Sequence, residues 1–138
     1  MLAKIGFAVA LVCVTLFAGA AQASRTEPVY NVQNHPIPIA VQKLSLDEIG
    51  RNIVQAGTPR HWRFEAIKPG EMNATYDNGK HSATIKISYT QKAFSITLVS
   101  TVNLLQEGNE VHRTYNHWVR NLEKDIEDRF QVIMLGAR

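Results

Sequence analysis

The stretch HSATIKISYT, residues 81–90, alternates strictly between two kinds of side chain. The set that would share one face of a strand is His81, Ala83, Ile85, Ile87 and Tyr89. The residues between them are serine, threonine and lysine. Because successive side chains of a strand point to opposite faces of a sheet, this pattern predicts one face in the core and one in water. It is typical of an antiparallel sheet covered on one side.

A second strand, at residues 94–102, follows after Gln91 and Lys92. A two-residue turn at this point places each inward residue opposite another inward residue, so the pairing supports itself. The expected partners are Tyr89 with Phe94, Ile87 with Ile96, Ile85 with Leu98, Ala83 with Ser100, and His81 with Val102.

Two earlier strands extend the sheet in the other direction. Asn78-Gly79 is a preferred hairpin turn, and a two-residue loop there pairs Tyr76 with His81, Ala74 with Ala83 and Met72 with Ile85. Before it, a strand at residues 62–68 is joined through Pro69-Gly70-Glu71. We expect a three-residue loop here, because a two-residue turn would put Arg63 and Glu65 into the core. The three-residue loop instead aligns Trp62, Phe64 and Ala66 with the core face.

The clearest helix start lies at Ser45. Its hydroxyl can cap the amide of Glu48 while the Glu48 carboxylate reaches back to Ser45, which is the capping-box arrangement. Apolar residues at helical spacing follow, and Gly57 ahead of Thr58-Pro59 ends the pattern. The sequence predicts a short amphipathic helix over residues 46–56.

A longer helix is predicted near the C-terminus. Its apolar positions, at spacings of three and four, are Val111, Tyr115, Trp118, Val119, Leu122, Ile126, Phe130 and Ile133. Glu123, Asp125, Glu127 and Asp128 are expected on its solvated faces. Asp125 and Arg129 are spaced for an ion pair, and Asn116 is expected to satisfy a backbone group.

Residues 24–43 form a polar lead-in that contains Pro28, Pro36 and Pro38. Proline rejects helices and central strands, so we expect extended chain with one edge strand at residues 39–42. Asn34-His35-Pro36 is interpreted as a turn.

The predicted elements define an α+β fold. It is an antiparallel meander of four or five strands, with a short N-terminal helix and a long C-terminal helix on its apolar face. Both apolar surfaces are covered at once only if the long helix closes the core over the sheet. We therefore expect a helix-grip-like two-layer sandwich, with a single α+β domain over residues 44–138.

Residues 1–23 have the pattern of a cleaved signal peptide. Lys4 precedes an apolar run, and Ala21-Gln22-Ala23 ahead of Ser24 is a site that signal peptidase accepts. This predicts export, a periplasmic location and no stable membrane span after cleavage. The alternative is an uncleaved anchor, since the run approaches the roughly 20 residues that cross a bilayer.

Cys13 is not expected to carry a lipid, because Val12 stands where a lipoprotein signal needs a small residue. Cleavage removes this single cysteine, so the mature chain has no disulfide and no thiol nucleophile. Its stability must come from a packed core.

Several function classes are disfavoured. The formal net charge of +3 falls by one when Lys4 leaves, which is too mild for a nucleic-acid partner. Neither nucleotide-binding fingerprint is present. His112 and His117 are five residues apart and point to different helix faces, which does not suit a metal site. We expect no catalytic residue, no metal and no cofactor, and therefore not an enzyme.

His81 is the most informative histidine, because strand parity turns it inward between Tyr76 and Val102. One interpretation is a rim histidine that is hydrogen-bonded to a neighbour. The other is the mouth of a small pocket between the sheet and the final helix, lined by His81, Tyr76, Ser100 and Trp118. Ser100 lacks a glycine-rich elbow and no carboxylate is forced near His81, so hydrolysis is not expected.

The chain resembles a group of small, exported, uncharacterised bacterial proteins, many described as lipoproteins. The likeness spans residues 44–126 and consists of Ala56-Gly57 ahead of Trp62, His81-x-Ala83, Ser100-x-x-Asn103-Leu104 and Tyr115-Asn116-x-Trp118-Val119-x-x-Leu122. The resemblance implies a Gram-negative periplasm and brings no catalytic residues. Lipid anchoring is not carried over, since Cys13 lacks the small preceding residue that lipid attachment requires.

Two functional hypotheses follow. The first is a non-catalytic periplasmic module that binds an envelope protein or other envelope component, and it rests partly on an outer sheet face rich in serine and threonine. The second is a small-ligand carrier or enzyme that uses the pocket near His81. An open cavity there would favour the second, and a packed interface between sheet and helix would favour the first.

Overall fold

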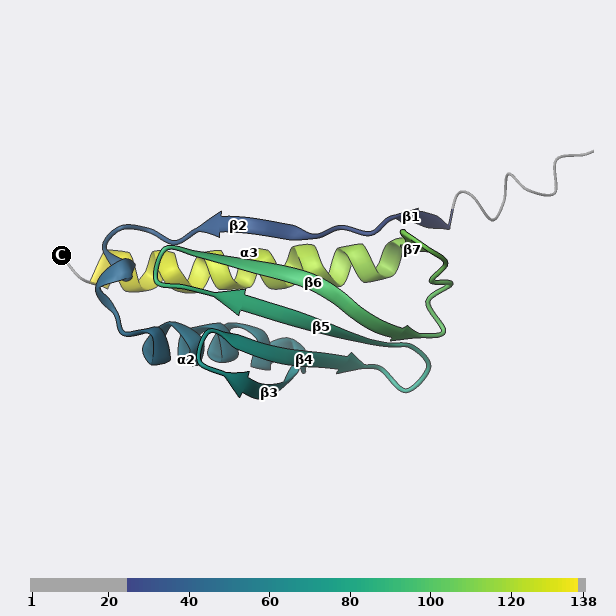
Figure 1. Cartoon of the computed structure of the whole chain (residues 1–138), viewed down its shortest axis with the longest axis horizontal. Helices are drawn as coiled ribbons and strands as arrows, with labels where there is room; N and C mark the ends of the chain where they lie inside the picture. The colour runs from purple at the N-terminus through teal and green to yellow at the C-terminus, as the bar shows by residue number, and fades with distance from the viewer. Residues whose placement is uncertain (1–24, 137–138) are drawn as a thin grey trace, which may run out of the picture.

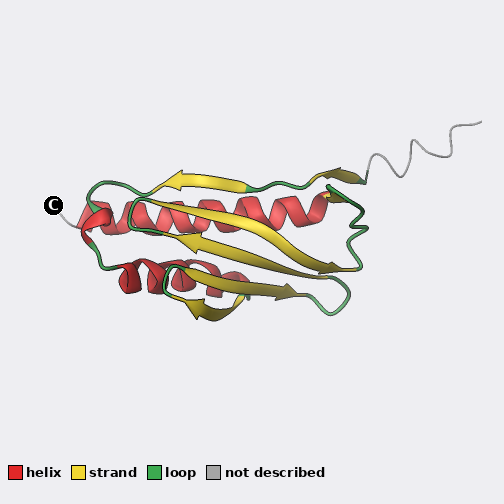
Figure 2. Cartoon of the chain, in the orientation of Figure 1, coloured by secondary structure: helices red, strands yellow, loops and turns green. Residues whose placement is uncertain are grey.

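A computed structural model describes residues 25–136 of the chain. It is an α+β fold in which an open, five-stranded antiparallel sheet carries two helices on one face (Figures 1 and 2). The strands are β2 (Val32–Pro36), β3 (Arg63–Lys68), β4 (Glu71–Asp77), β5 (Ser82–Tyr89) and β6 (Ala93–Val102), in the spatial order β2-β6-β5-β4-β3. The predicted two-layer architecture is confirmed, with five strands in the sheet.

The two helices are α2 (Leu46–Gly57) and α3 (Arg113–Gly136). The capping box of α2 is confirmed, because Ser45 N donates to Glu48 Oε2 at 2.8 Å and Glu48 N donates to Ser45 Oγ at 3.1 Å. The expectation that Val111 lies in the long helix is wrong. Val111 belongs to β7 (Glu110–His112), which pairs with β1 (Thr26–Pro28) as a separate two-stranded sheet.

Side chains fill the space between the sheet and the helices. The largest that are fully buried are Tyr115, Phe94, Phe130, Ile37, Ile49, Ile53, Ile85, Ile87, Ile96, Leu122, Ile126 and Val41. They come from both layers and include the inward positions of β5 that the alternating stretch predicts. Two short 3₁₀ segments, η1 (Val41–Lys43) and η2 (Thr58–Arg60), lie on either side of α2 in sequence. Among the described residues, none of the helices is long and apolar enough to cross a membrane.

The pairing of β5 with β6 is confirmed from Tyr89–Phe94 to Ile85–Leu98 and then departs from the prediction. A β-bulge follows, so that Thr84 pairs with Ser100 and Ala83 with Thr101. Val99 is the extra residue, and it is 52% exposed. Because side chains alternate, one inserted residue moves Ser100 to the outer face, the side of the sheet away from the helices.

The pairing of β4 with β5 differs from the prediction by two residues, with Tyr76 opposite Ala83 and Ala74 opposite Ile85. The loop has four residues, 78–81, instead of the expected two. Side chains stabilise this longer loop, since Asp77 accepts from Gly79 N at 2.8 Å and Asn78 accepts from the amides at 80 and 81. A shift of two residues keeps every inward side chain inward.

The expected three-residue loop between β3 and β4 is also wrong. Lys68 pairs directly with Glu71 across a two-residue Pro69–Gly70 turn, and an irregularity lies between Ala66 and Lys68. This irregularity returns Phe64 to a position opposite Ala74. The prediction of the core face is therefore right, although the loop length is not.

The lead-in contains a strand, but at a different place from the one expected. Residues 39–42 form a turn and the start of η1, whereas β2 includes the Asn34-His35-Pro36 segment that was interpreted as a turn. β2 pairs with β6 at the edge of the sheet, where a terminal proline costs no ladder bond. Asn34, at a φ of 49°, takes up the irregularity between Val32 and His35. The signal-peptide prediction lies outside the described residues.

Candidate functional site

Three aromatic rings meet at one end of the sheet. Tyr76 belongs to β4, Trp118 to α3, and Trp62 follows η2. The ring centroid of Tyr76 lies 4.5 Å from that of Trp118, edge to face, and 5.7 Å from that of Trp62. Trp62 is 3% exposed, while Tyr76 and Trp118 are half-buried. These rings form the base of a cleft of about 340 Å³, which we call the aromatic cleft.

Polar side chains complete the aromatic cleft. They are Arg60, His61 and Asn121. Arg60 Nε donates to Asp125 Oδ2 at 2.6 Å, which fixes the guanidinium at the rim and raises its pKa. His61 has a left-handed backbone with a φ of 73°, and this residue ends η2 and directs the chain into Trp62. A neighbouring hollow of about 490 Å³ shares His61 and Trp62.

The structure brings together two of the four residues of the candidate pocket, Tyr76 and Trp118. His81 lies in the 78–81 loop, where its Nδ1 contacts the carbonyl oxygen of Asn103 at 2.7 Å. This contact matches the interpretation as a rim histidine. Ser100 is exposed and pairs with Thr84 on the outer face, so it does not face His81.

Sequence reasoning missed Arg60, His61 and Asn121 as parts of a site. Trp62 was assigned to the core face, and it is indeed buried. No sequence signal places it in the same cleft as Trp118, because its position depends on the path of the chain from η2 into β3. The expected ion pair between Asp125 and Arg129 is wrong, since Asp125 binds Arg60 and Arg129 donates to Asn52 at 2.9 Å.

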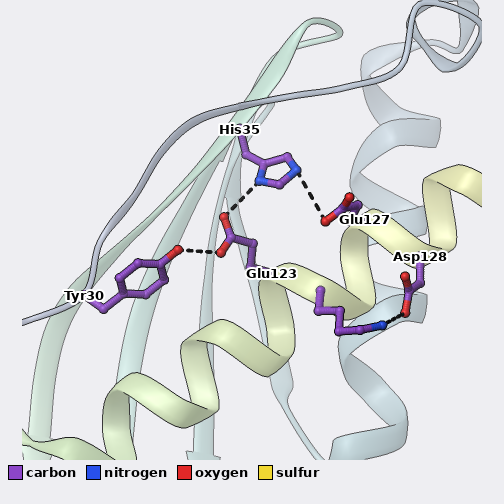
Figure 3. Close-up of polar contacts among 6 residues, drawn as sticks. Tyr30, His35, Glu123, Glu127 and Asp128 are labelled. Carbon is purple, nitrogen blue, oxygen red and sulfur yellow. Dashed lines mark hydrogen bonds and ion pairs between the residues drawn. The ribbon is translucent and has the colours of Figure 1, made fainter.

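A second polar cluster holds the N-terminal segment to α3 (Figure 3). We call residues 26–36 the strap. The Tyr30 hydroxyl donates to Glu123 Oε1 at 2.6 Å, and His35 Nδ1 lies 2.9 Å from Glu123 Oε2. His35 Nε2 lies 3.9 Å from Glu127, and the imidazole stacks on Phe94 at 4.8 Å.

Two more residues of α3 extend this contact. Asn116 is 1% exposed; its Oδ1 accepts from Tyr30 N at 2.9 Å, and its Nδ2 donates to Pro28 O at 3.0 Å. The Arg120 guanidinium lies over the Tyr30 ring at 4.4 Å. The expectation that Asn116 satisfies a backbone group is confirmed. The expectation of a solvated Glu123 is wrong, since its side chain is 19% exposed and occupied by the strap.

Both carboxylate oxygens of Glu123 have a partner in the strap, Tyr30 for one and His35 for the other. The bond to Glu123, together with burial and the negative charge of Glu123, raises the pKa of the Tyr30 hydroxyl. Within residues 25–136, no three His, Cys, Asp or Glu side chains are placed to hold a metal ion. We assign the cluster a structural role, because its polar groups are directed at one another.

The outer face of the sheet is polar and combines threonine hydroxyls with charged side chains. Thr75 and Thr84 share a hydrogen bond at 3.1 Å, and Glu71 lies between Lys68 at 3.6 Å and Lys86 at 4.0 Å. These interactions link neighbouring strands on a surface that the helices do not cover (Figure 2). The residues that line the aromatic cleft belong instead to η2, β4, α3 and the link from η2 to β3.

No family model matches the chain, and the search of curated proteins found no relative.

Proposed function

We propose that this protein is an exported, non-catalytic binding module of the periplasm, and that its binding site is the aromatic cleft. The observation that carries the proposal is the convergence of Trp62, Tyr76 and Trp118 beneath a polar rim. A concave site that combines aromatic rings with a few polar groups is the usual form of a ligand site.

Two observations favour binding over catalysis. His81 and Ser100, the pair that could supply a base and a nucleophile, belong to different surroundings, with His81 bound to a backbone carbonyl and Ser100 on the outer face. Nucleophilic catalysis requires the two groups within hydrogen-bond reach of each other. The aromatic cleft itself holds no carboxylate among its lining residues.

The second candidate is a small-ligand carrier or enzyme with a pocket between the sheet and α3. It has weaker support, because Ile85, Ile87 and Tyr115 are fully buried in that layer. The aromatic cleft lies instead at the margin of the two layers, where a ligand can remain partly in water. A surface site of this kind suits a component of the envelope better than a sequestered small molecule.

The proposal can be tested through the two tryptophans of the chain, since both lie in the aromatic cleft. Mature protein with ¹⁵N-labelled indoles is mixed with separated envelope fractions, and the two indole N–H resonances are followed by NMR. We expect at least one fraction to shift both resonances and to emerge chemically unchanged. Indole resonances that no envelope fraction shifts would contradict a binding site in the aromatic cleft, and turnover of the ligand would contradict a non-catalytic role.

Export is tested separately. The mass of the protein recovered from a periplasmic fraction should correspond to a chain that begins at Ser24. Recovery of a chain that retains residues 1–23 in the membrane fraction would instead support an anchor.

A further inference from the structure

The geometry of the rings restricts what the aromatic cleft can hold. The Tyr76 ring is inclined by 61° to Trp118 and by 50° to Trp62. Neither pair is parallel, so these pairs leave no slot in which a flat ring could be sandwiched between two aromatic faces. They form a concave corner instead. A puckered ring with axial C–H groups fits such a corner better than a planar base or an indole.

The rim of the aromatic cleft is suited to hydroxyl groups. Asn121 is exposed, and its amide offers both a donor and an acceptor side by side. Arg60 uses Nε for Asp125, and a guanidinium has further N–H donors on its other nitrogens. His61 is an exposed lining residue of the same cleft, and its imidazole can donate or accept a hydrogen bond. Neighbouring hydroxyls of a ligand, each both donor and acceptor, can pair with all three kinds of group.

Two other ligand classes fit less well. An aromatic cage for a quaternary ammonium group needs rings without competing positive charge, and the Arg60 guanidinium lies at this rim. A hydrocarbon chain needs an enclosed apolar pocket, whereas half of the lining residues here are polar.

We propose that the aromatic cleft binds a saccharide. The apolar face of a sugar ring lies against Tyr76 and Trp118, and its hydroxyls bond to Asn121 and Arg60. This assignment rests on the proposed function and names the ligand class of the same site. A saccharide can remain partly hydrated at this site, because Asn121 at its rim is exposed.

The test uses two defined probes, chitotriose and maltotriose, added to the mature protein at millimolar concentration. We expect one of them to shift both indole resonances in a saturable way, with a dissociation constant on the order of 1 mM or lower. Adenosine monophosphate and tetramethylammonium serve as planar and cationic comparisons. The proposal is overturned if neither sugar shifts the indoles, or if either comparison compound binds more tightly than both sugars.

Variants on the surface of α3 keep the test independent of folding. Asn121→Ala removes one exposed amide of the cleft and should weaken sugar binding by about fivefold, the effect of one lost hydrogen bond. Gln131→Ala removes an exposed amide on the same helix outside the aromatic cleft and should leave binding unchanged. Equal affinity in the two variants would contradict the assigned contacts. If an envelope fraction shifts the indole resonances but neither sugar does, the proposed binding function stands and the saccharide assignment fails.

Discussion

At the scale of single residues, two tyrosines have opposite surroundings. The Tyr30 hydroxyl donates to Glu123, whereas the Tyr115 hydroxyl is buried without a hydrogen-bond partner among the described residues. Burial raises the pKa of Tyr115 by disfavouring its charged form. Removing the same atom should therefore have opposite effects at the two positions.

We expect Tyr30→Phe to lower the free energy of unfolding by about 1 kcal/mol, through the lost hydrogen bond. Tyr115→Phe should raise it by about 1 kcal/mol, because a buried hydroxyl without a partner carries a desolvation cost. Urea unfolding at neutral pH measures both values, and each variant serves as the control for the other. Destabilisation by Tyr115→Phe would mean that this hydroxyl has a partner in solution.

The Tyr30–Glu123 bond should also be sensitive to alkaline pH. In the folded protein, the pKa of the Tyr30 hydroxyl is raised above the ordinary value of 10.0. The stabilisation that this hydroxyl contributes is therefore present below pH 10 and is lost as the pH rises through the raised pKa. The difference in urea midpoint between the wild type and Tyr30→Phe should therefore shrink above about pH 10. A difference that stays constant to the alkaline limit of folding would show that Glu123 does not bind the neutral phenol.

Asn116 is the most buried polar residue of the strap contact. Asn116→Ala leaves the amide of Tyr30 and the carbonyl of Pro28 without their partner, and we expect a loss of about 2–3 kcal/mol in the free energy of unfolding. Hydrogen exchange at the Tyr30 amide should accelerate. His117→Ala, at the exposed neighbour, should change stability by less than about 0.5 kcal/mol. An equal loss of stability in the two variants would contradict the prediction that Asn116 holds the strap to α3.

At the scale of elements, the sequence predicted those features that depend on residues close together in the chain. Ser45 and Glu48 lie one helical turn apart, and the alternation over residues 81–90 specifies which face is buried. The bulge at Val99 could not be predicted in the same way. Leu98, Val99 and Val102 are all apolar, so the pattern does not say which of them is inserted. The four-residue loop 78–81 is stabilised by hydrogen bonds from backbone amides to the side chains of Asp77 and Asn78, and the sequence pattern alone does not favour it over a two-residue turn.

Two of the six residues that line the aromatic cleft, Tyr76 and Trp118, were predicted as pocket residues. Strand parity gave Tyr76 and helical spacing gave Trp118. His81 and Ser100 were misplaced by the longer loop and by the bulge, respectively. The strap contacts join residues 93 and 88 positions apart, and nothing near Tyr30 or His35 in the sequence indicates them.

The packing of α2 against β3 and α3 depends on Gly57. A Cβ there would meet Phe64 Cζ and would come within 3.0 Å of Leu122 Cδ1. We expect Gly57→Ala to destabilise the protein by about 1–3 kcal/mol through overpacking, as measured by urea unfolding. At Gly136 no described atom lies within 4 Å of an added Cβ, so Gly136→Ala is the matched control. Phe64→Leu should recover part of the loss, and a simple sum of the two effects would argue against this contact.

At the scale of the whole molecule, the strap closes the fold. β2 lies beside β6 at the edge of the sheet (Figure 1). The strap is also joined to α3, because Tyr30 N donates to Asn116 Oδ1. The strap is thus held by β6, the last strand of the five-stranded sheet in sequence, and by α3. The opposite edge strand, β3, carries the charged side chains of Arg63 and Glu65, which disfavour pairing with the edge of another chain.

Removal of residues 24–36 should therefore lower the stability of the fold and expose the edge of the sheet at β6. Val32 is 3% exposed, and loss of its burial alone costs about 1.5–3 kcal/mol. The deletion also leaves the β6 edge unpaired, and an open apolar edge promotes pairing with a second copy. We expect a lower urea midpoint and self-association that increases with concentration, measured by analytical ultracentrifugation. Gln33→Ala, an exposed change within the strap, should do neither. A truncated chain that stays monomeric with an unchanged midpoint would mean that the strap is not docked in solution.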